Sequence, residues 1–233
     1  PRRSGRRGIF ALCVLGALFI VWLLPIKASL VALIFGSIAA GATYVLRTSA
    51  ARLIATVIVV SMLVLPWMFV YPPFQQSIEA QRVTMATNLQ ERLVAWEFVS
   101  TKTMDAPIIG HGFRASRKIS QEAGQTSVPE PGKSGLKEIH KLPLHPHNWV
   151  LQVWLELGAI GIGFAVLLVV GLFRVIGRYG DHPLFMAAAI GSLVTFFCIA
   201  SLSFGFWQKW WLATGWIALG TMALVAPRSD END

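Results

Sequence analysis

The chain of 233 residues is 55% hydrophobic, carries a charge on only 14% of its residues and has a mean hydropathy of +0.59. These values exclude an ordinary soluble domain of this length and are typical of a protein that crosses a membrane several times. The formal net charge of +8 does not indicate nucleic-acid binding, because the basic residues flank apolar runs instead of forming a basic face. Cys13 and Cys198, the two cysteines, lie inside apolar runs and provide no disulfide framework.

Six apolar segments are each close to the ~20 residues that cross a hydrocarbon core of ~30 Å. The sequence therefore predicts an all-α membrane protein with about six transmembrane helices, over residues 8–26, 28–46, 53–70, 149–173, 184–203 and 210–226. Residues 1–71 and 147–226 each contribute three of these spans, and residues 227–233 form a short tail. Because the chain begins with Pro1 and not with methionine, we expect it to be the carboxy-terminal part of a longer protein.

The distribution of Lys and Arg predicts the orientation, since basic residues concentrate in cytoplasmic segments. If the amino terminus is cytoplasmic, that side collects most of the arginines, whereas the short turns on the opposite side hold only Lys27 and Lys209. Residues 72–146 then form one large extracytoplasmic loop. We expect the tail at 227–233 to be cytoplasmic.

The predicted loop contains three kinds of sequence. Between residues 77 and 104, apolar side chains recur at helical spacing and predict an amphipathic helix near the membrane face; they are Leu89, Leu93, Trp96 and Val99. Residues 107–113 predict a tight glycine turn. Residues 114–142 are polar and rich in turn formers, which predicts a mobile flap.

Two histidines precede the fourth span, where a polar loop becomes an apolar helix. His147 is followed by Asn148, a residue type that caps helices well, and is preceded two positions earlier by His145. An imidazole titrates near neutral pH, so His147 is a candidate general base for a hydroxyl nucleophile. An interfacial histidine at a helix start is the structural alternative, and position alone favours it.

Polar residues continue into this span at helical spacing. Asn148, Gln152 and Glu156 lie at i, i+4 and i+8 and therefore share one stripe. A glutamate at this depth is costly unless it is paired or faces water, so Glu156 is a candidate functional residue. A structural hydrogen bond to a neighbouring helix is the equal alternative. Small residues such as Gly158 and Gly161 further along permit close helix packing.

Three basic residues are candidates for binding anions. Arg92 lies on the apolar side of the predicted loop helix, where a guanidinium either reaches solvent or is held for phosphate oxygens. Lys27 is the one charge of its short turn, and its spacing alone favours the alternative that it anchors the helix at the membrane interface. Arg114 follows the glycine turn and could meet acidic sugars or phosphates, although a solvated loop surface is the simpler explanation.

The histidines do not predict a metal site. His145 and His147 with the distant His111 and His140 lack the three well-placed ligands and the cysteine or HExxH patterns of zinc sites. We therefore expect neither a metal nor another cofactor.

Two motifs resemble those of one bacterial family. His147 and Asn148, followed by nine residues and then by Gly158 and Gly161, resemble the H-[NSQ]-x9-G-x-x-G signature of the O-antigen ligase family and its polymerase relatives. Upstream, residues 91–96 (ERLVAW) and 107–112 (PIIGHG) resemble that family's R-L-x-x-W and P-x-x-G-x-G segments. Members commonly carry Ser-Arg near the position of Lys27, where this sequence has lysine, which keeps the charge but not the guanidinium fork.

The resemblance implies a metal-independent, GT-C-like membrane glycosyltransferase of the bacterial inner membrane with its active site on the periplasmic face. Such an enzyme transfers a glycan from undecaprenyl diphosphate to a sugar hydroxyl of lipid A-core, with inversion at the anomeric carbon. His147 would be the base, Arg92 and Lys27 would neutralise the departing diphosphate, and His145, Asn148, Glu156 and Arg114 would contact substrate. Membrane lipids are the other implied partners.

Other functions stay open at this point. A polysaccharide polymerase and a protein O-oligosaccharyltransferase share the motifs and differ in the acceptor. A transporter or flippase with Glu156 as a proton-coupling carboxylate is the main non-enzymatic alternative, but the sequence lacks the inverted repeats with broken helices that are typical of transporters. A purely structural membrane subunit is the third possibility.

Overall fold

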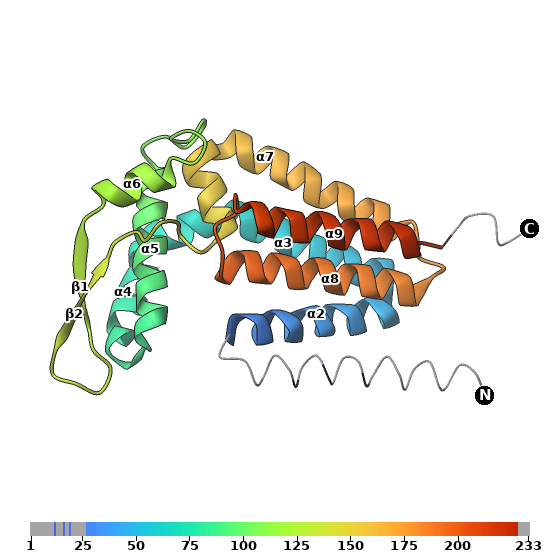
Figure 1. The fold of residues 1–233 in the computed structure, drawn as a ribbon, viewed down its shortest axis with the longest axis horizontal. Coiled ribbons are helices and arrows are strands. Elements are labelled where there is room, and N and C mark those ends of the chain that lie inside the picture. Colours follow the sequence, from blue (N-terminus) through green and yellow to red (C-terminus); the bar gives the residue numbers. More distant parts are fainter. Residues whose placement is uncertain (1–11, 13–15, 17–18, 20–26, 228–233) are drawn as a thin grey trace, which may run out of the picture.

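The structure is a computed structural model that describes residues 12, 16, 19 and 27–227. Within this part, long helices lie side by side in a bundle, and the segment between the third and fourth predicted spans gathers at one end of it (Figure 1). The bundle helices are α2 (Lys27–Leu46), α3 (Thr48–Val70), α7 (Trp149–Gly177), α8 (Pro183–Leu202) and α9 (Lys209–Val225). Most of the predicted span at residues 8–26 and nearly all of the tail lie outside the described residues.

Four of the bundle helices are long and apolar enough to cross a membrane: residues 28–46 of α2, together with α3, α7 and α8. The described part is thus predominantly helical, and the protein is an all-α membrane protein as predicted. Helix α9 is shorter, with 17 residues. The total of about six spans and the GT-C-like architecture stay predictions.

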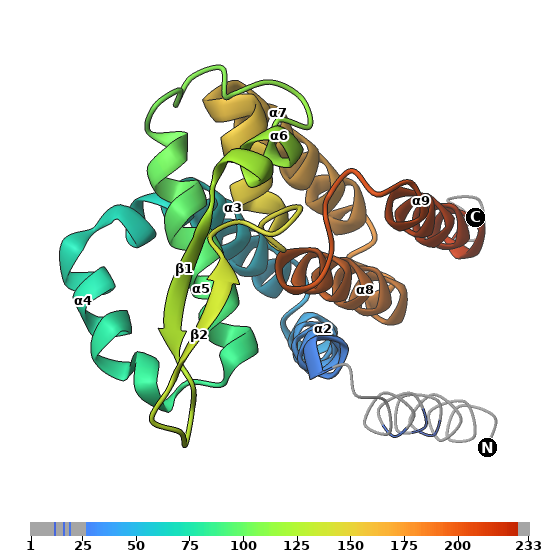
Figure 2. The same cartoon turned by 60° about the vertical axis from the view of Figure 1, so that its left-hand side comes forward.

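Small residues and aromatic rings hold the bundle together. A Cβ atom on Gly36 of α2 would lie 2.7 Å from the carbonyl oxygen of Gly191 in α8, so glycine permits the close contact of these helices. Between α7 and α3, the indole of Trp154 donates a hydrogen bond of 2.8 Å to the carbonyl oxygen of Met62. The ring of Trp149 stacks on Phe197 of α8 with centroids 5.4 Å apart. Figure 2 shows α2 beside α8 at the lower side of the bundle.

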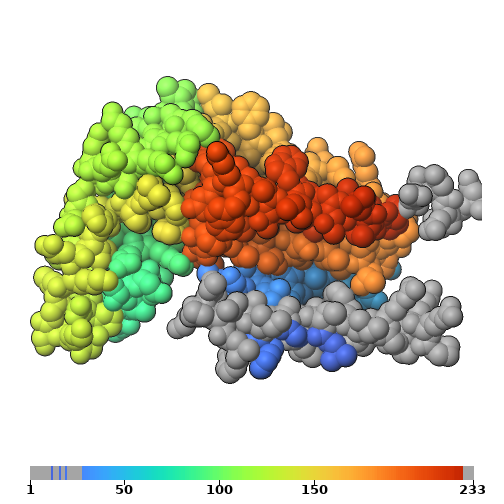
Figure 3. Space-filling view, in the orientation of Figure 1, coloured from blue at the N-terminus to red at the C-terminus, as the bar shows by residue number. Residues whose placement is uncertain are grey.

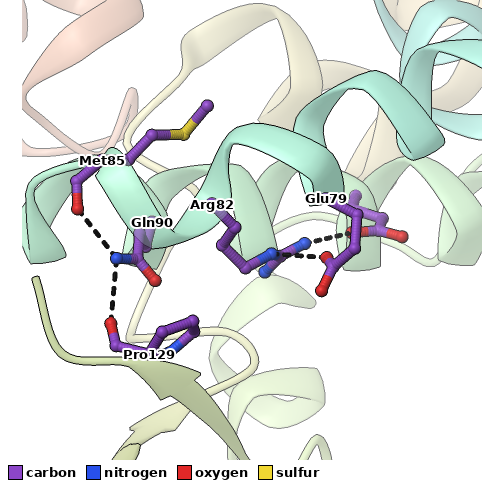
Figure 4. Close-up of polar contacts among 6 residues, drawn as sticks. Glu79, Arg82, Met85, Gln90 and Pro129 are labelled. Carbon is purple, nitrogen blue, oxygen red and sulfur yellow. Dashed lines mark hydrogen bonds and ion pairs between the residues drawn. The ribbon is translucent and has the colours of Figure 1, made fainter. Parts of the chain in front are cut away.

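The α3–α7 segment, residues 71–148, differs from its prediction in its first half. One amphipathic helix was predicted over 77–104, but the structure has α4 (Pro72–Gln81), a 3-10 turn η1 (Arg82–Thr84) and α5 (Thr87–Thr103). Met85 and Ala86 are extended, with ψ of 143° and 142°, and this breaks the helix. Arg82 reinforces the break by pairing with Glu79 at 2.6 Å and with Glu97 of α5 at 3.6 Å (Figure 4).

The predicted flap at 114–142 contains ordered elements instead. Helix α6 (Ser116–Glu122) is followed by an antiparallel hairpin of β1 (Gln125–Pro129) and β2 (Leu136–His140), with Val128 opposite Lys137. Val128 and Ile139 are buried against Val94 of α5. The amide of Gln90 in α5 donates hydrogen bonds to the carbonyl oxygens of Met85 and Pro129, at 2.8 and 3.0 Å (Figure 4). The hairpin is therefore fastened to α5.

Candidate active site

The two glycine motifs meet at a kink in α7. Gly158 has φ 59° and ψ −156°, which interrupts the helical hydrogen bonds of α7. The loop at 107–112 replaces the missing partners: the amides of His111 and Gly112 donate to the carbonyl oxygens of Leu155 and Glu156, each at 2.9 Å. On the other side of the kink, the amides of residues 159 and 160 donate to the carbonyl oxygens of residues 107 and 108, at 2.8 and 3.2 Å.

Both glycines are required by this contact. A Cβ on Gly158 would lie 2.5 Å from the carbonyl carbon of Ile108, and a Cβ on Gly110 would lie 2.4 Å from the carbonyl carbon of Glu156. Gly110 also has a positive φ of 68°. Gly158 was expected to serve close helix packing, and in the structure it instead forms the docking point of the 107–112 loop.

Glu156 lies beneath this contact, fully buried, and its two oxygens accept four hydrogen bonds. The donors are the Ser116 hydroxyl (2.5 Å), the Gln152 amide (3.0 Å), the Arg114 backbone N–H (2.8 Å) and the Trp207 indole (2.5 Å). The carboxylate thus ties α7 to α6 and to the connection between α8 and α9. The role of Glu156 in binding substrate stays a prediction, and the observed contacts are those of a residue that positions these segments.

Asn148 caps α7 as predicted, because its side chain oxygen accepts a hydrogen bond from the backbone N–H of Leu151 at 3.1 Å. The side chain is buried. Asn148, one residue after His147, thereby fixes the start of α7 at Trp149. Its predicted contact with substrate stays a prediction.

The orientation of the His147 ring is fixed by the end of α8. The ring nitrogen Nδ1 lies 2.8 Å from the carbonyl oxygen of Ser203. A carbonyl oxygen can only accept, so Nδ1 carries the proton of this hydrogen bond. In the neutral ring, Nε2 therefore has a free lone pair and can accept a proton. His147 also has a positive φ of 53°, an uncommon conformation for a residue with a side chain.

His145 packs against His147, with ring centroids 4.3 Å apart. Burial lowers the pKa of His145 to about 4, with smaller contributions from the charges of His147 and Arg117. The His145 ring is also in tight contact with Gly205, where a Cβ would lie 2.7 Å from the ring. His145 is thus an uncharged neighbour of His147, and it also lines the pocket described below.

Arg92 is half-buried on α5 and has no hydrogen-bond or ion-pair partner among the described residues. One helical turn further, Trp96 donates an indole hydrogen bond of 2.8 Å to the carbonyl oxygen of Pro146. Residues at i and i+4 share a helix face, so the face of α5 that carries Arg92 is the one fastened to the histidine loop. Lys27 is the first residue of α2, and its side chain lies outside the described part of the structure.

A pocket of about 330 Å³ opens beside His145. On the face shown in Figure 3, it lies where the segment containing α6 (green), the loop before α7 (yellow) and the α8–α9 connection (orange-red) come together. Its lining includes three basic side chains, Arg114, Arg117 and Lys209, and no acidic one. A larger pocket of about 660 Å³ between α3 and α7 contains none of the predicted site residues.

Several residues of this region were missed by the sequence-based prediction. Ser203, Trp207 and Gln208 lie in or beside a short turn between two spans, where the sequence carries no motif. Ser116 lies in the stretch 114–142, for which the sequence predicts only a polar flap. Their roles depend on contacts with residues some 40 to 60 positions away, such as the one between Ser203 and His147. Among the described residues, no three His, Cys, Asp or Glu side chains gather in a way that could hold a metal ion.

These features define a membrane protein with several spans. Its polar site lies where the α3–α7 segment docks on the kinked helix α7. A family model described as O-antigen ligase matches residues 3–166, and the chain belongs to this family. No solved structure matches the chain.

Curated relatives agree with this family. A protein of Rickettsia prowazekii (strain Madrid E) with the provisional name polysaccharide ligase is 31% identical over 216 residues, which cover 89% of this chain and 51% of the relative. A similarly named protein of Rickettsia typhi (strain ATCC VR-144 / Wilmington) is 30% identical over 214 residues, with the same coverage. The chain therefore spans about half the length of these relatives.

Proposed function

We propose that the protein transfers a glycan from a polyprenyl diphosphate, specifically undecaprenyl diphosphate, to a sugar hydroxyl of lipid A-core. The observation that carries this proposal is the His147 ring, which is held by the Ser203 carbonyl oxygen so that Nε2 is free to accept a proton. Family membership and the names of the relatives support a ligase that acts on polysaccharide.

The reaction would proceed by in-line displacement. The acceptor hydroxyl oxygen attacks the anomeric carbon while Nε2 of His147 takes the hydroxyl proton. The bond between the anomeric carbon and the diphosphate oxygen breaks, and undecaprenyl diphosphate leaves with the bonding electrons. The configuration inverts because attack and departure occur on opposite faces of the sugar. The imidazolium then returns its proton to solvent.

Arg92 and Lys27 would bind the diphosphate. Arg92 has no partner among the described residues and lies on the α5 face that is fastened to the histidine loop, so its guanidinium is available for phosphate oxygens. Lys27, at the start of α2, would add a second positive charge. Both would stabilise the negative charge that grows on the leaving group. We place this site on the periplasmic face of the inner membrane, because the basic residues of the short turns concentrate at the opposite ends of the spans.

The remaining predicted residues would support this site. Asn148 sets the start of α7 directly after the base, and Glu156 holds α6 and the α8–α9 connection in place around it. His145 contacts the base through its ring, and Arg114 lines the neighbouring pocket.

Reconstitution of the full-length protein in proteoliposomes tests the proposal. With a labelled undecaprenyl-diphosphate glycan and lipid A-core as acceptor, we expect covalent transfer of label to lipid A-core. Transfer to another carrier-linked glycan would instead indicate a polymerase, and transfer to protein an oligosaccharyltransferase. Movement of the labelled donor across the bilayer without any covalent product would refute a transferase and favour a transporter.

A further inference from the structure

We propose that the pocket beside His145 binds a sugar of the acceptor that carries a phosphate or carboxylate group. This inference rests on the proposed function, because it assigns the pocket to the acceptor of that reaction. It adds a second anion site to the one proposed at Arg92 and Lys27, formed by α6, the loop before α7 and the α8–α9 connection.

The charge of the pocket is not compensated within the described part of the chain. Arg114, Arg117 and Lys209 line it, and none of them forms an ion pair there. Elsewhere in the α3–α7 segment five basic side chains do pair with a carboxylate; they are Arg82, Lys102, Lys118, Lys133 and Lys137. Glu156 accepts a hydrogen bond from the backbone N–H of Arg114, but none of its four donors is a basic side chain. The three cations therefore remain available to a negatively charged ligand.

Uncharged polar residues also line the pocket, among them His145 and Gln208. A sugar hydroxyl group can both donate and accept hydrogen bonds, so it can pair with imidazole and amide side chains.

The remaining lining suits a saccharide. Trp207 and Trp210 present aromatic rings with apolar faces, which can pack against the C–H faces of a sugar ring. The volume of about 330 Å³ lies at the lower end of the range of roughly 300–1,000 Å³ that small-ligand sites occupy. Cations, uncharged polar side chains and indole rings together match an anionic monosaccharide unit.

The position of the pocket favours the acceptor over the donor. His145 lines the pocket and contacts His147, whose Nε2 would take the proton from the acceptor hydroxyl. A sugar held next to His145 is thus close to the base. The donor diphosphate is assigned to Arg92 and Lys27, which do not line this pocket.

Direct binding is the first test. Glucose 6-phosphate, glucuronate and glucose are titrated into the full-length protein in nanodiscs, and binding is measured by saturation-transfer NMR. We expect the two anions to bind about tenfold tighter than glucose or better, with the advantage shrinking at high salt. Arg117→Gln and Lys209→Gln should each remove most of that advantage. Lys118→Gln is the matched control, because Lys118 neighbours Arg117 but does not line the pocket. Equal binding of all three sugars, or unchanged binding in Arg117→Gln and Lys209→Gln, would overturn the proposal.

The second test separates acceptor from donor. Transfer is measured with synthetic acceptor saccharides that are identical except for one phosphate group. In the Arg117→Gln, Lys209→Gln double variant, KM for the phosphorylated acceptor should rise about tenfold or more, while KM for the donor stays the same. A rise in the donor KM alone would overturn the acceptor assignment. Anion-selective binding without transfer to any acceptor would leave the pocket as a site for anionic sugars and refute the proposed function instead.

Discussion

Replacement of Gly158 by alanine tests the docking of the two motifs. The substitution places a Cβ 2.5 Å from the carbonyl group of Ile108, in a backbone conformation, φ 59° and ψ −156°, that is almost confined to glycine. The backbone strain alone costs about 1–3 kcal/mol. The clash of the Cβ with the Ile108 carbonyl group adds to this strain, so we expect a loss of about 3 kcal/mol in the local stability of this contact, the upper end of the range for strain alone. This loss favours undocking of the 107–112 loop and release of its four backbone hydrogen bonds.

Hydrogen–deuterium exchange reports this loss directly, because the amides of His111 and Gly112 donate across the contact. In Gly158→Ala these two amides should exchange about a hundredfold faster or more, the factor that corresponds to 3 kcal/mol. Gly163→Ala is the matched control: Gly163 lies on the same helix, five residues further, with open space around its Cβ position. Unchanged exchange at His111 and Gly112 in Gly158→Ala would refute the argument.

Two further predictions concern buried groups. Glu156→Gln replaces an accepting oxygen by a donating NH2 group that faces other donors. The free energy of unfolding of this variant should fall by about 1–3 kcal/mol, and the variant should melt at a lower temperature. Glu122 is exposed, so Glu122→Gln should melt like the wild type. Equal melting of the two variants would contradict the positioning role of Glu156. The second prediction concerns His145, whose pKa is lowered from 6.5 to about 4. His145 binds a proton more readily in the unfolded chain than in the folded protein. Its contribution to the free energy of unfolding is therefore complete above about pH 6.5 and is lost as the pH falls toward 4. Between pH 6.5 and pH 4, the free energy of unfolding measured by chemical denaturation should therefore fall less in His145→Gln than in the wild type. An equal fall in the two proteins would contradict the lowered pKa of His145.

The bounds of three bundle helices, α2, α8 and α9, follow closely from the sequence. The predictions 28–46, 184–203 and 210–226 correspond to helices at 27–46, 183–202 and 209–225. This agreement has a physical reason, since the length of an apolar run and the polar residues at its ends are local properties of the chain. The helix cap at Asn148 was predictable for the same reason.

Features that depend on distant contacts were not predictable. The kink at Gly158 exists because a loop some 50 residues earlier supplies its hydrogen-bond partners. The hairpin at 125–140 buries only Val128 and Ile139, too few apolar residues to stand out in a polar stretch. The donors to Glu156 come from α6 and from the α8–α9 connection, so its surroundings could not be read from its own helix. The motif residues were identifiable, but their physical role needed the structure.

The proton acceptor role of His147 is the central claim, and the transfer rate of His147→Ala under saturating donor and acceptor tests it most directly. His140→Ala is the matched control, because His140 is exposed on β2. The account predicts that His147→Ala lowers kcat by about 10²–10⁴-fold, the usual contribution of a positioned general base, while His140→Ala transfers at the wild-type rate. A His147→Ala variant that is folded and transfers glycan at the wild-type rate would contradict it.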